Sequence, residues 1–352
     1  MLLAAQSPAT VLALEANVKF TVIIATYNRA NDVGRTLDSL AGLRTAHLWE
    51  VIIVDNNSHD ATAQVVAEAR AGFPVDLQYL FEPEQGKAAA LNTAIRRARG
   101  EILAFTDDDV RVEPDWLDRA LEGLQRFACD YVGGKALPIW AGPRPAWIPG
   151  RSGNQWAVIA LLDYGPEPIE FGKRVPLGVN LAVRRTAFLE QHLWWDNAFD
   201  RKGASLRGQG QREWCLRARA AGLRGFCIPQ MVVHHRIASE RLQKRYFRKW
   251  MYWKGISRAI MYAKTGRDME APERGSVDFS TVPHILGVPR YMYRQFLRCS
   301  IRMIRLTASR RDPIGAFELE MWLWFFLGVV KQRWRDRSGG VPAPQVGGEL
   351  QS

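Results

Sequence analysis

The chain has 352 residues, of which 47% are hydrophobic and 24% charged, and this balance excludes a mostly disordered or collagen-like protein. Its 48 lysines and arginines outnumber its 36 aspartates and glutamates, which gives a net charge of +12. An excess of positive charge favours an anionic partner, and composition alone leaves nucleic acid, a phosphorylated ligand and an anionic membrane surface open.

The cysteines and the apolar runs bear on the compartment. The four cysteines are far apart and form no CxxC pair, so we expect neither a zinc knuckle nor a disulfide framework, and a reducing compartment is favoured. The N-terminal stretch lacks a basic region and Glu15 interrupts it, so we do not expect a signal peptide. No uninterrupted apolar run reaches the roughly 18 to 20 residues of a spanning helix. The nearest is Met321–Val330, with ten.

The first third of the chain alternates between two patterns. Short apolar, β-branched runs predict buried strands at Lys19–Ala25, Glu50–Val54, Leu77–Phe81 and Ile102–Thr106. Apolar residues at helical spacing predict helices at Arg29–Leu40, Ala61–Ala71 and Ala88–Arg99. This alternation predicts an α/β fold, in which a mostly parallel sheet carries helices on both faces. In such sheets ligands bind beyond the carboxyl ends of the strands.

Polar residues follow three of these four strands. They are Thr26-Tyr27-Asn28, Asp55-Asn56-Asn57 and Asp107-Asp108-Asp109. Three consecutive carboxylates repel one another, and Mg²⁺ or Mn²⁺ would relieve that repulsion and hold a diphosphate. The alternative is a solvated acidic turn. The first strand–helix turn lacks the GxGxxG and P-loop patterns, so neither a dinucleotide-dependent dehydrogenase nor a P-loop NTPase is supported.

Several segments together resemble the successive motifs of family 2 inverting glycosyltransferases, in order and in spacing. They are Thr21–Leu40, Val54–Thr62, Glu84–Arg97 and Phe105–Val110, followed by Gly178–Arg185, Gly208–Arg219 and the region around His235. The resemblance covers roughly residues 18–255. It implies the GT-A fold, a Rossmann-like domain that binds a nucleotide sugar.

The resemblance also implies a donor site at the strand ends. Its nucleotide-binding members are Ala25, Thr26, Tyr27, Asp55, Gly86, Lys87, Asp107 and Asp108. Asp55 is implied to bind the base. Asp109 is implied to be the principal ligand of an Mn²⁺ or Mg²⁺ ion, with Asp107 touching ribose or metal and His235 serving as a further metal or diphosphate ligand. His234 is expected to be structural.

The acceptor side is less sharply defined. Asn180 is implied to contact the donor sugar or the acceptor. The alternative is that it belongs to an ordinary buried strand, because the residues around it have a strand pattern. The segment Leu137–Gly153 is rich in Pro, Gly and Trp, and it predicts a loop over the acceptor cleft without regular structure. Trp147 in this loop is expected to stack on sugar rings, with packing in the protein as the alternative.

The chain departs from the family at the general base. Relatives carry Gly-Glu-Asp-X-Glu before a Cys-Leu-Arg-like helix, and here Gln211 stands at the position of the basic Asp. An amide cannot accept the proton of the acceptor hydroxyl. Three interpretations stay open: Glu213, which matches the final acid, is the base; Asp196 or Asp200 is the base; or the protein is inactive.

The C-terminal third is basic. Aromatic and basic residues alternate over Arg241–Lys264, and arginines recur every fourth residue from Arg290 to Arg302, which makes one basic helix face. These patterns favour an amphipathic helix on an anionic membrane, and the alternative is a helical subdomain packed on the catalytic domain. We therefore expect an N-terminal extension (1–17), a GT-A domain (18–240), a helical basic region (241–337) and a disordered tail (338–352).

These features predict a metal-dependent inverting glycosyltransferase. We expect the sugar to move from a nucleotide sugar, UDP-linked, to a saccharide or polyprenyl-linked acceptor in polysaccharide or envelope biosynthesis. The expected location is cytoplasmic and peripheral, on the inner face of the cell membrane, and nucleic acid is not expected as a partner. The alternative is a catalytically degenerate relative that acts as a nucleotide-sugar-binding or scaffold subunit.

Overall fold

The computed structural model describes residues 18–150, 154–200, 205–268, 277–278 and 281–338. The chain forms two compact units, and each is described by itself below. The first comprises Met1–Ile139, Ala160–Asp200 and Gly210–Arg236, and the second comprises Trp140–Ile159, Arg201–Gln209 and Ile237–Ser352. The predicted boundary at residue 240 stays a prediction, and the predicted N-terminal extension and all but the first residue of the predicted tail lie outside the described residues.

The described part of the first unit is built on one mixed sheet with the strand order β3-β2-β1-β4-β8-β6-β9-β5, and β7 (Ile169–Glu170) pairs with β9. The parallel part contains β1 (Phe20–Thr26), β2 (Trp49–Asp55), β3 (Asp76–Phe81) and β4 (Ile102–Thr106). The antiparallel part contains β5 (Val110–Val112), β6 (Tyr131–Trp140), β8 (Asn180–Arg184) and β9 (Gly225–Ile237). The predicted α/β class and the four predicted strands are confirmed.

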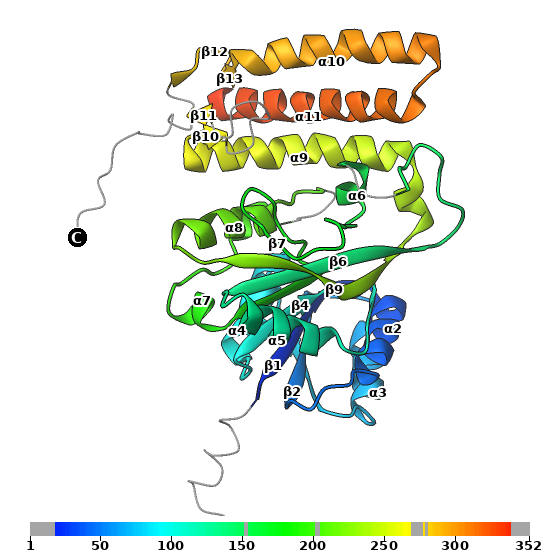
Figure 1. Ribbon diagram of the computed structural model, residues 1–352, viewed down its shortest axis with the longest axis vertical. Coiled ribbons are helices and arrows are strands. Elements are labelled where there is room, and N and C mark those ends of the chain that lie inside the picture. The colour runs from blue at the N-terminus through cyan, green and yellow to red at the C-terminus, as the bar shows by residue number, and fades with distance from the viewer. Residues whose placement is uncertain (1–17, 151–153, 201–204, 269–276, 279–280, 339–352) are drawn as a thin grey trace, which may run out of the picture. The chain divides into compact units, whose positions relative to one another are not determined.

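Helices cover both faces of the parallel strands, as predicted (Figure 1). The helices α2 (Ala30–Ala41) and α3 (Thr62–Arg70) lie on one face and α4 (Lys87–Arg97) on the other. Alternation along β1 explains this, because Val22 and Ile24 join the core under α2 while Ile23 joins the core under α4. The remaining helical elements of this unit are α5 (Trp116–Arg126), α7 (Thr186–Leu189), η1 (Asn197–Phe199) and α8 (Gly210–Ala220).

The segment predicted to be an irregular loop is in part a strand. The structure extends β6 through Pro138 to Trp140, so the prediction was wrong for residues 137–140. Pro138 lies beyond the three residue pairs that join β6 to β8, which end at Gly133, so its missing N–H interrupts none of these pairs, and β9 is the other neighbour of β6. Residues 141–150 form no helix or strand, in agreement with the prediction, and 151–153 lie outside the described residues.

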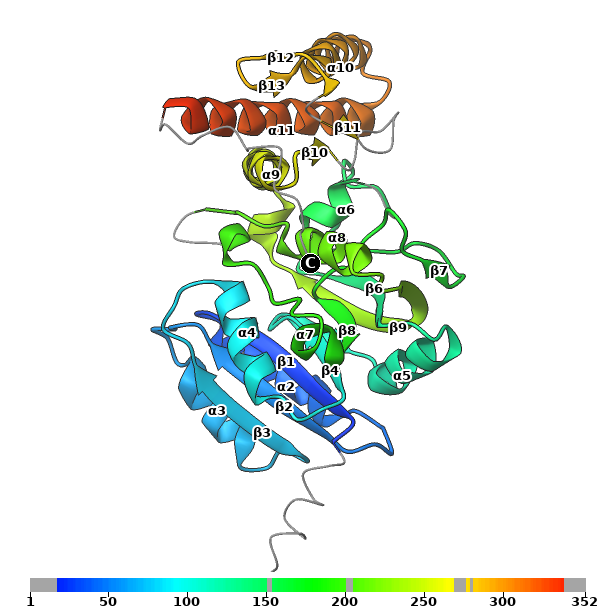
Figure 2. The ribbon, with the colours of Figure 1, turned by 90° about the vertical axis from the view of Figure 1, so that its left-hand side faces the viewer.

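The second unit is mainly helical. Its long helices are α9 (Lys244–Thr265), α10 (Arg290–Ser309) and α11 (Pro313–Ser338), preceded by the short α6 (Asn154–Val158) and η2 (Ser239–Leu242). Two small hairpins pair β10 (Arg267–Asp268) with β11 (Val277–Asp278), and β12 (His284–Ile285) with β13 (Val288–Pro289). The helix α11 lies between α9 and α10 and contacts both (Figures 1 and 2).

Two glycines let α9 and α11 approach closely. A Cβ atom on Gly255 would lie 2.0 Å from the carbonyl oxygen of Phe325, and one on Gly328 would lie 2.0 Å from that of Tyr252. Glu320 of α11 accepts from Arg248 of α9 at 2.5 Å. The two helices are therefore joined along much of their length by backbone proximity and by a charged pair.

One helix among the described residues, Pro313–Arg337, is long and apolar enough to cross a membrane by length and composition. This corrects the expectation that no segment qualifies. Glu318 and Glu320 interrupt the apolar run in the sequence, but the helix continues through them and gains the apolar residues on their N-terminal side. Length and composition alone are weak support for a span, because core helices of soluble proteins meet the same criterion.

Candidate active site

The carboxyl ends of β1, β2 and β4 lie side by side in the first unit. The parallel register pairs Thr26 with Asp55 and Ile24 with Thr106. The acidic turn Asp107-Asp108-Asp109 therefore follows its strand at the same edge as Thr26 and Asp55. The structure thus brings together the polar strand ends that the sequence singled out, while Ala25 and Tyr27 flank Thr26, Tyr27 being exposed.

Asp55 is buried, and both of its carboxylate oxygens accept hydrogen bonds. The backbone N–H of Ser58 donates to Oδ1 at 2.8 Å, and the hydroxyl of Tyr79 donates to Oδ2 at 2.7 Å. The sequence indicated the turn contact, whereas the bond from Tyr79 of β3 was not expected. Burial and the neighbouring Asp55 carboxylate raise the pKa of Tyr79, so this hydroxyl stays a donor at all ordinary pH values.

The helix α4 begins at the site with Gly86 and Lys87. A Cβ atom on Gly86 would lie 2.1 Å from Oδ2 of Asp200, and the φ of this residue is 151°, so that glycine is required. Asp200 accepts from the N–H of Ala88 at 2.8 Å, which satisfies a free donor in the first turn of α4. The ammonium group of Lys87 forms an ion pair with Asp107.

Asp109 is the most buried of the three consecutive acids, with 4% of its surface exposed. Its Oδ1 lies 3.0 Å from Nε2 of His235, and its Oδ2 lies 3.3 Å from a guanidinium nitrogen of Arg29. The pairing of β5 with β9 explains the first contact, because Val110 is opposite His235 in the register. The prediction that His235 and Asp109 belong to one site thus has a geometric basis.

The other two acids have different surroundings. The Asp108 carboxyl accepts from the hydroxyl of Thr26 at 2.8 Å. Burial raises the pKa of Asp108 to about 7, and the adjacent Asp109 adds to the increase, while Arg29 opposes it. The pKa of Asp108 therefore lies closer to neutral than that of an ordinary aspartate.

The neighbouring histidine has another partner. Nε2 of His234 lies 2.6 Å from Oε1 of Glu113, on the opposite side of β9 from His235. This contact agrees with the expected structural role of His234.

The described residues contain no group of three or more His, Cys, Asp and Glu side chains that could hold a metal ion. Asp109 and His235 nevertheless form an adjacent oxygen and nitrogen pair, and such a donor set suits Mn²⁺. Ions of this kind are commonly held by one or two protein side chains together with phosphate oxygens of the substrate. The residues present therefore fit a metal whose remaining ligands come from a bound diphosphate.

Glu213 lies in the first turn of α8 and is buried. Both of its oxygens accept from Arg217, at 2.7 Å from Nε and at 3.0 Å from a terminal nitrogen. Arg217 also donates to the carbonyl of Trp194 at 2.7 Å. The carboxylate is thus held in one orientation by a guanidinium that is itself anchored to the backbone.

The other residues considered for the base have structural contacts as well. The side-chain oxygen of Gln211 would lie 3.1 Å from a Cβ atom placed on Gly178. The amide nitrogen of Gln211 is 3.6 Å from Sγ of Cys215. Asp196 accepts from the N–H of Ala198 at 2.8 Å and so caps η1. Asp200, as described above, caps α4 through the N–H of Ala88.

Two predicted acceptor residues are engaged in packing. The amide nitrogen of Asn180 donates to the carbonyls of Lys135 and Met231, both at 2.8 Å, and its oxygen accepts from the indole of Trp116 at 2.8 Å. These bonds tie β8 to α5, β6 and β9, so we do not include Asn180 among the substrate-binding residues proposed below. In the second unit, Trp147 packs edge-on against Phe247 and Phe317 with ring centroids 4.9 Å apart in both pairs.

Sequence reasoning missed Arg29 and Tyr79. Arg29 directly follows the polar end of β1, and a cation next to a strand that neighbours three acids was a usable signal. No signal in the sequence pointed to Tyr79. Its contact with Asp55 depends on the strand register, in which Tyr79 pairs with Ile53 and therefore lies diagonally opposite Asp55 on the same face of the sheet.

Comparisons with known proteins identify the domain that carries these strand ends. The family model "Glycosyl transferase family 2" matches residues 21–174, which include the ends of β1, β2 and β4, the start of α4 and the acidic turn. These residues form a family 2 glycosyltransferase domain.

The curated relatives of this family 2 domain match only part of this chain. Glycosyltransferase AglE of Haloferax volcanii is 34% identical over 116 residues, which are 32% of this chain and 38% of AglE. The glucosyl-dolichyl phosphate glucuronosyltransferase of the same organism is 23% identical over 253 residues, 69% of this chain and 77% of the relative. The first three curated relatives are matched over 38%, 42% and 35% of their own lengths.

Solved structures agree on the fold. The mannosyltransferase PcManGT from Pyrobaculum calidifontis, solved in complex with GDP-Man and Mn²⁺, superposes with a TM-score of 0.59 at 18% identity. The superposition covers 91% of this chain and 88% of PcManGT. The predicted GT-A architecture of the family 2 domain is thereby confirmed.

Proposed function

We propose that this protein is a metal-dependent inverting glycosyltransferase that moves a sugar from a nucleotide sugar to a saccharide or lipid-linked acceptor. The observation that carries the proposal is the contact between Asp109 and His235 at the carboxyl end of the parallel strands, inside a family 2 domain. A ligand is expected at that edge of an open α/β sheet.

The nucleotide is proposed to bind along the ends of β1 and β2 and at the start of α4. Asp55 would accept from the base, while Thr26 and its two neighbours Ala25 and Tyr27 would contact the nucleoside. Gly86 keeps the start of α4 open to the backbone, and Lys87 supplies a positive charge for the phosphates. UDP is the first nucleotide to test, and GDP the second, because PcManGT was solved with GDP-Man.

Asp109 and His235 are the proposed ligands of Mn²⁺ or Mg²⁺. When bound, such an ion supplies Lewis-acid stabilisation to the diphosphate as negative charge develops on it. Arg29 and Lys87, which contact Asp109 and Asp107, are the cations of this chain placed to hold the departing diphosphate. In this proposal Asp107 orients Lys87 and stands beside the ion.

Glu213 is the proposed general base. One of its carboxylate oxygens takes the proton from the acceptor hydroxyl, whose oxygen forms a bond to the anomeric carbon as the bond to the diphosphate breaks. Attack from the face opposite the leaving group inverts the anomeric configuration. Arg217 fixes the orientation of Glu213. Gln211, two residues before Glu213, would hydrogen-bond the acceptor.

A lipid-linked acceptor would place the reaction at the cytoplasmic face of a membrane. Support comes from the relative that is named for glucosyl-dolichyl phosphate and that matches this chain over 69% of its length. Polysaccharide or envelope biosynthesis is the process proposed for the product.

The test uses the full-length protein. We expect UDP or GDP to bind in calorimetry only when Mn²⁺ or Mg²⁺ is present, and we expect a matching nucleotide sugar to release nucleotide when acceptors are added. Binding that is indifferent to metal and to EDTA would contradict the proposed donor site. Metal-dependent binding without transfer to any acceptor would favour the alternative that Gln211 supports, a degenerate nucleotide-sugar-binding subunit.

Tyr79→Phe is expected to weaken nucleotide binding about tenfold or more. The substitution removes the hydroxyl that donates to Oδ2 of Asp55, and hydrogen bonds to charged groups contribute about 1.5–3 kcal/mol. Calorimetry with UDP or GDP and Mn²⁺ measures the change. Tyr164→Phe is the control, because its hydroxyl donates at 3.0 Å to the carbonyl of Val175. Equal affinities in the two variants would remove Tyr79 from the base site.

A further inference from the structure

The helix α10 of the second unit combines exposed apolar side chains with exposed arginines. Leu297 is 60% exposed, Ile301 44% and Ile304 62%. Five arginines of the same helix are also exposed: Arg290, Arg294, Arg298, Arg302 and Arg305. We call these eight residues the outer face of α10.

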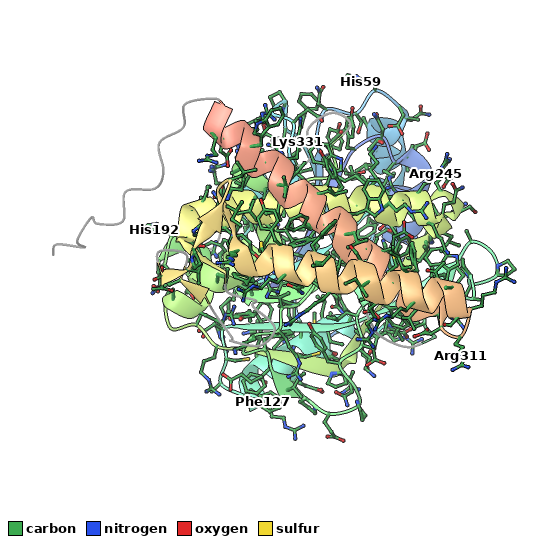
Figure 3. The ribbon with its side chains drawn as sticks, turned by 90° about the horizontal axis from the view of Figure 1, so that it is seen from above. His59, Phe127, His192, Arg245, Arg311 and Lys331 are labelled. Carbon is green, nitrogen blue, oxygen red and sulfur yellow. The ribbon has the colours of Figure 1, made fainter. Side chains whose placement is uncertain are left out.

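Helical geometry makes this face continuous. Residues 297, 301 and 304 are spaced by four and three and so form one ridge, and Arg290, Arg294 and Arg298 repeat every four residues beside it. The other side of α10 is partnered, because the ring of Phe296 lies 4.7 Å from that of Phe326 in α11. Figure 3 shows α10 from outside, with Arg311 labelled beyond its C-terminal end.

The charge on this face is entirely of one sign. From Arg290 to Arg311 the chain has seven arginines and no acidic residue. None of the five arginines of the outer face forms an ion pair with a described residue. A solvated surface has no need of large aliphatic side chains among its cations. A helix that lies in a membrane surface uses both kinds of side chain: the aliphatic ones insert among the lipids, and the cationic ones contact anionic headgroups.

The hairpin before α10 adds a second apolar element. Ile285 and Leu286 at its turn are 46% and 65% exposed. The hydroxyl of Tyr293, on α10, donates to the carbonyl of Ile285 at 3.0 Å, so the turn is attached to the helix.

The arrangement of the three helices decides how a bilayer would be contacted. By composition α11 is the candidate span, but it packs against α9 on one side and α10 on the other, with the glycine contacts to α9 described above. Crossing a bilayer would require α11 to leave both neighbours. The outer face of α10, in contrast, is accessible in the fold as it stands.

We propose that the outer face of α10 docks flat on an anionic lipid bilayer. Leu297, Ile301 and Ile304 enter the headgroup region, with Leu286 of the hairpin beside them. The arginines contact lipid phosphates and acidic headgroups, and α11 stays within the helical layer. This surface does not depend on the proposed donor site, and it specifies a peripheral mode of attachment.

Cosedimentation of the full-length protein with vesicles tests the proposal. We expect binding to phosphatidylcholine mixed with phosphatidylglycerol, weak binding to phosphatidylcholine alone, and release by high salt and by a carbonate wash. Arg294→Gln with Arg298→Gln is expected to lower partitioning about 30-fold, since each arginine near an anionic surface contributes about a fivefold effect and the two effects multiply. Replacing Leu297, Ile301 and Ile304 with serine is expected to lower it at least about tenfold.

The matched control is Arg70→Gln with Arg97→Gln, two exposed arginines at the ends of α3 and α4 in the first unit. It carries the same loss of net charge, and we expect near-normal vesicle binding. All variants are checked by circular dichroism and by nucleotide binding, which should not change, so that a failure of the proposed function is seen separately. Equal binding of the control and the α10 variant, retention after the carbonate wash, or a dimer that only the serine variant dissociates would each overturn the proposal.

Discussion

Replacement of Asp109 by asparagine is expected to lower turnover of the nucleotide sugar about 1,000-fold and to abolish the metal dependence of nucleotide binding. Asparagine has nearly the same shape, so the substitution removes the charge and one strong ligand oxygen while leaving the backbone of the acidic turn in place. A metal ion contributes several kcal/mol of charge stabilisation to a departing diphosphate, which corresponds to that loss.

The position of Asp109 makes this effect specific. Its side chain is buried between His235 and Arg29, and the strand pairing of β5 with β9 holds the histidine next to it. Calorimetry with UDP or GDP, with and without Mn²⁺, measures binding, and release of nucleotide from the donor measures turnover. Asp76→Asn is the control, because Asp76 is an exposed carboxylate paired with Arg99 at the start of β3. Metal-dependent binding by the Asp109 variant would show that the ion is held elsewhere.

Replacement of Glu213 by glutamine is expected to lower kcat by a factor of about 100 to 10,000 while leaving nucleotide affinity unchanged. General-base catalysis by a positioned side chain contributes an effect of that size. The amide oxygen of glutamine still accepts from Arg217, so the anchored arrangement of α8 should persist. What is lost is a group able to accept the acceptor's proton.

The measurement is transfer to acceptor at saturating donor, with thermal unfolding as a check on the fold. Glu170→Gln is the control, since Glu170 pairs with Arg224 at the surface, 3.4 Å apart, and touches no proposed substrate residue. Normal kcat in the Glu213 variant would transfer the role of base to Asp196 or Asp200. Asp200→Asn is then the next variant, with stability measured alongside because Asp200 caps α4.

Much of the fold was predictable because its causes are local. The β-branched runs at β1, β2 and β4 are buried on both faces, so hydrophobic periodicity alone located them. The carboxyl ends of parallel neighbours share one edge, so the prediction that Thr26, Asp55 and the acidic turn meet followed from the alternation of strands and helices. Element boundaries moved by only a residue or two, as at α4, which begins at Lys87 rather than Ala88.

The errors came where the pattern was non-local. The Pro/Gly/Trp-rich segment was expected to lack regular structure, yet β6, which also neighbours β9, continues through Pro138 beyond the end of its pairing with β8. The apolar length of α11 was underestimated, since two glutamates that interrupt the run in the sequence do not interrupt the helix. In each case the outcome depends on a neighbouring element that is distant along the chain.

The sequence by itself determined the α/β class, the polar strand ends, the family 2 motifs and the basic stripe of α10, because strand and helix periodicity and strand-end chemistry are written in short stretches of residues. Only the tertiary structure decided which distant groups meet: His235 with Asp109 and Tyr79 with Asp55. It also decided that Asn180 is enclosed by packing and that α11 is covered on two sides while the outer face of α10 is not. The physical reason is that contacts between distant residues depend on register and packing, which no short stretch of sequence specifies.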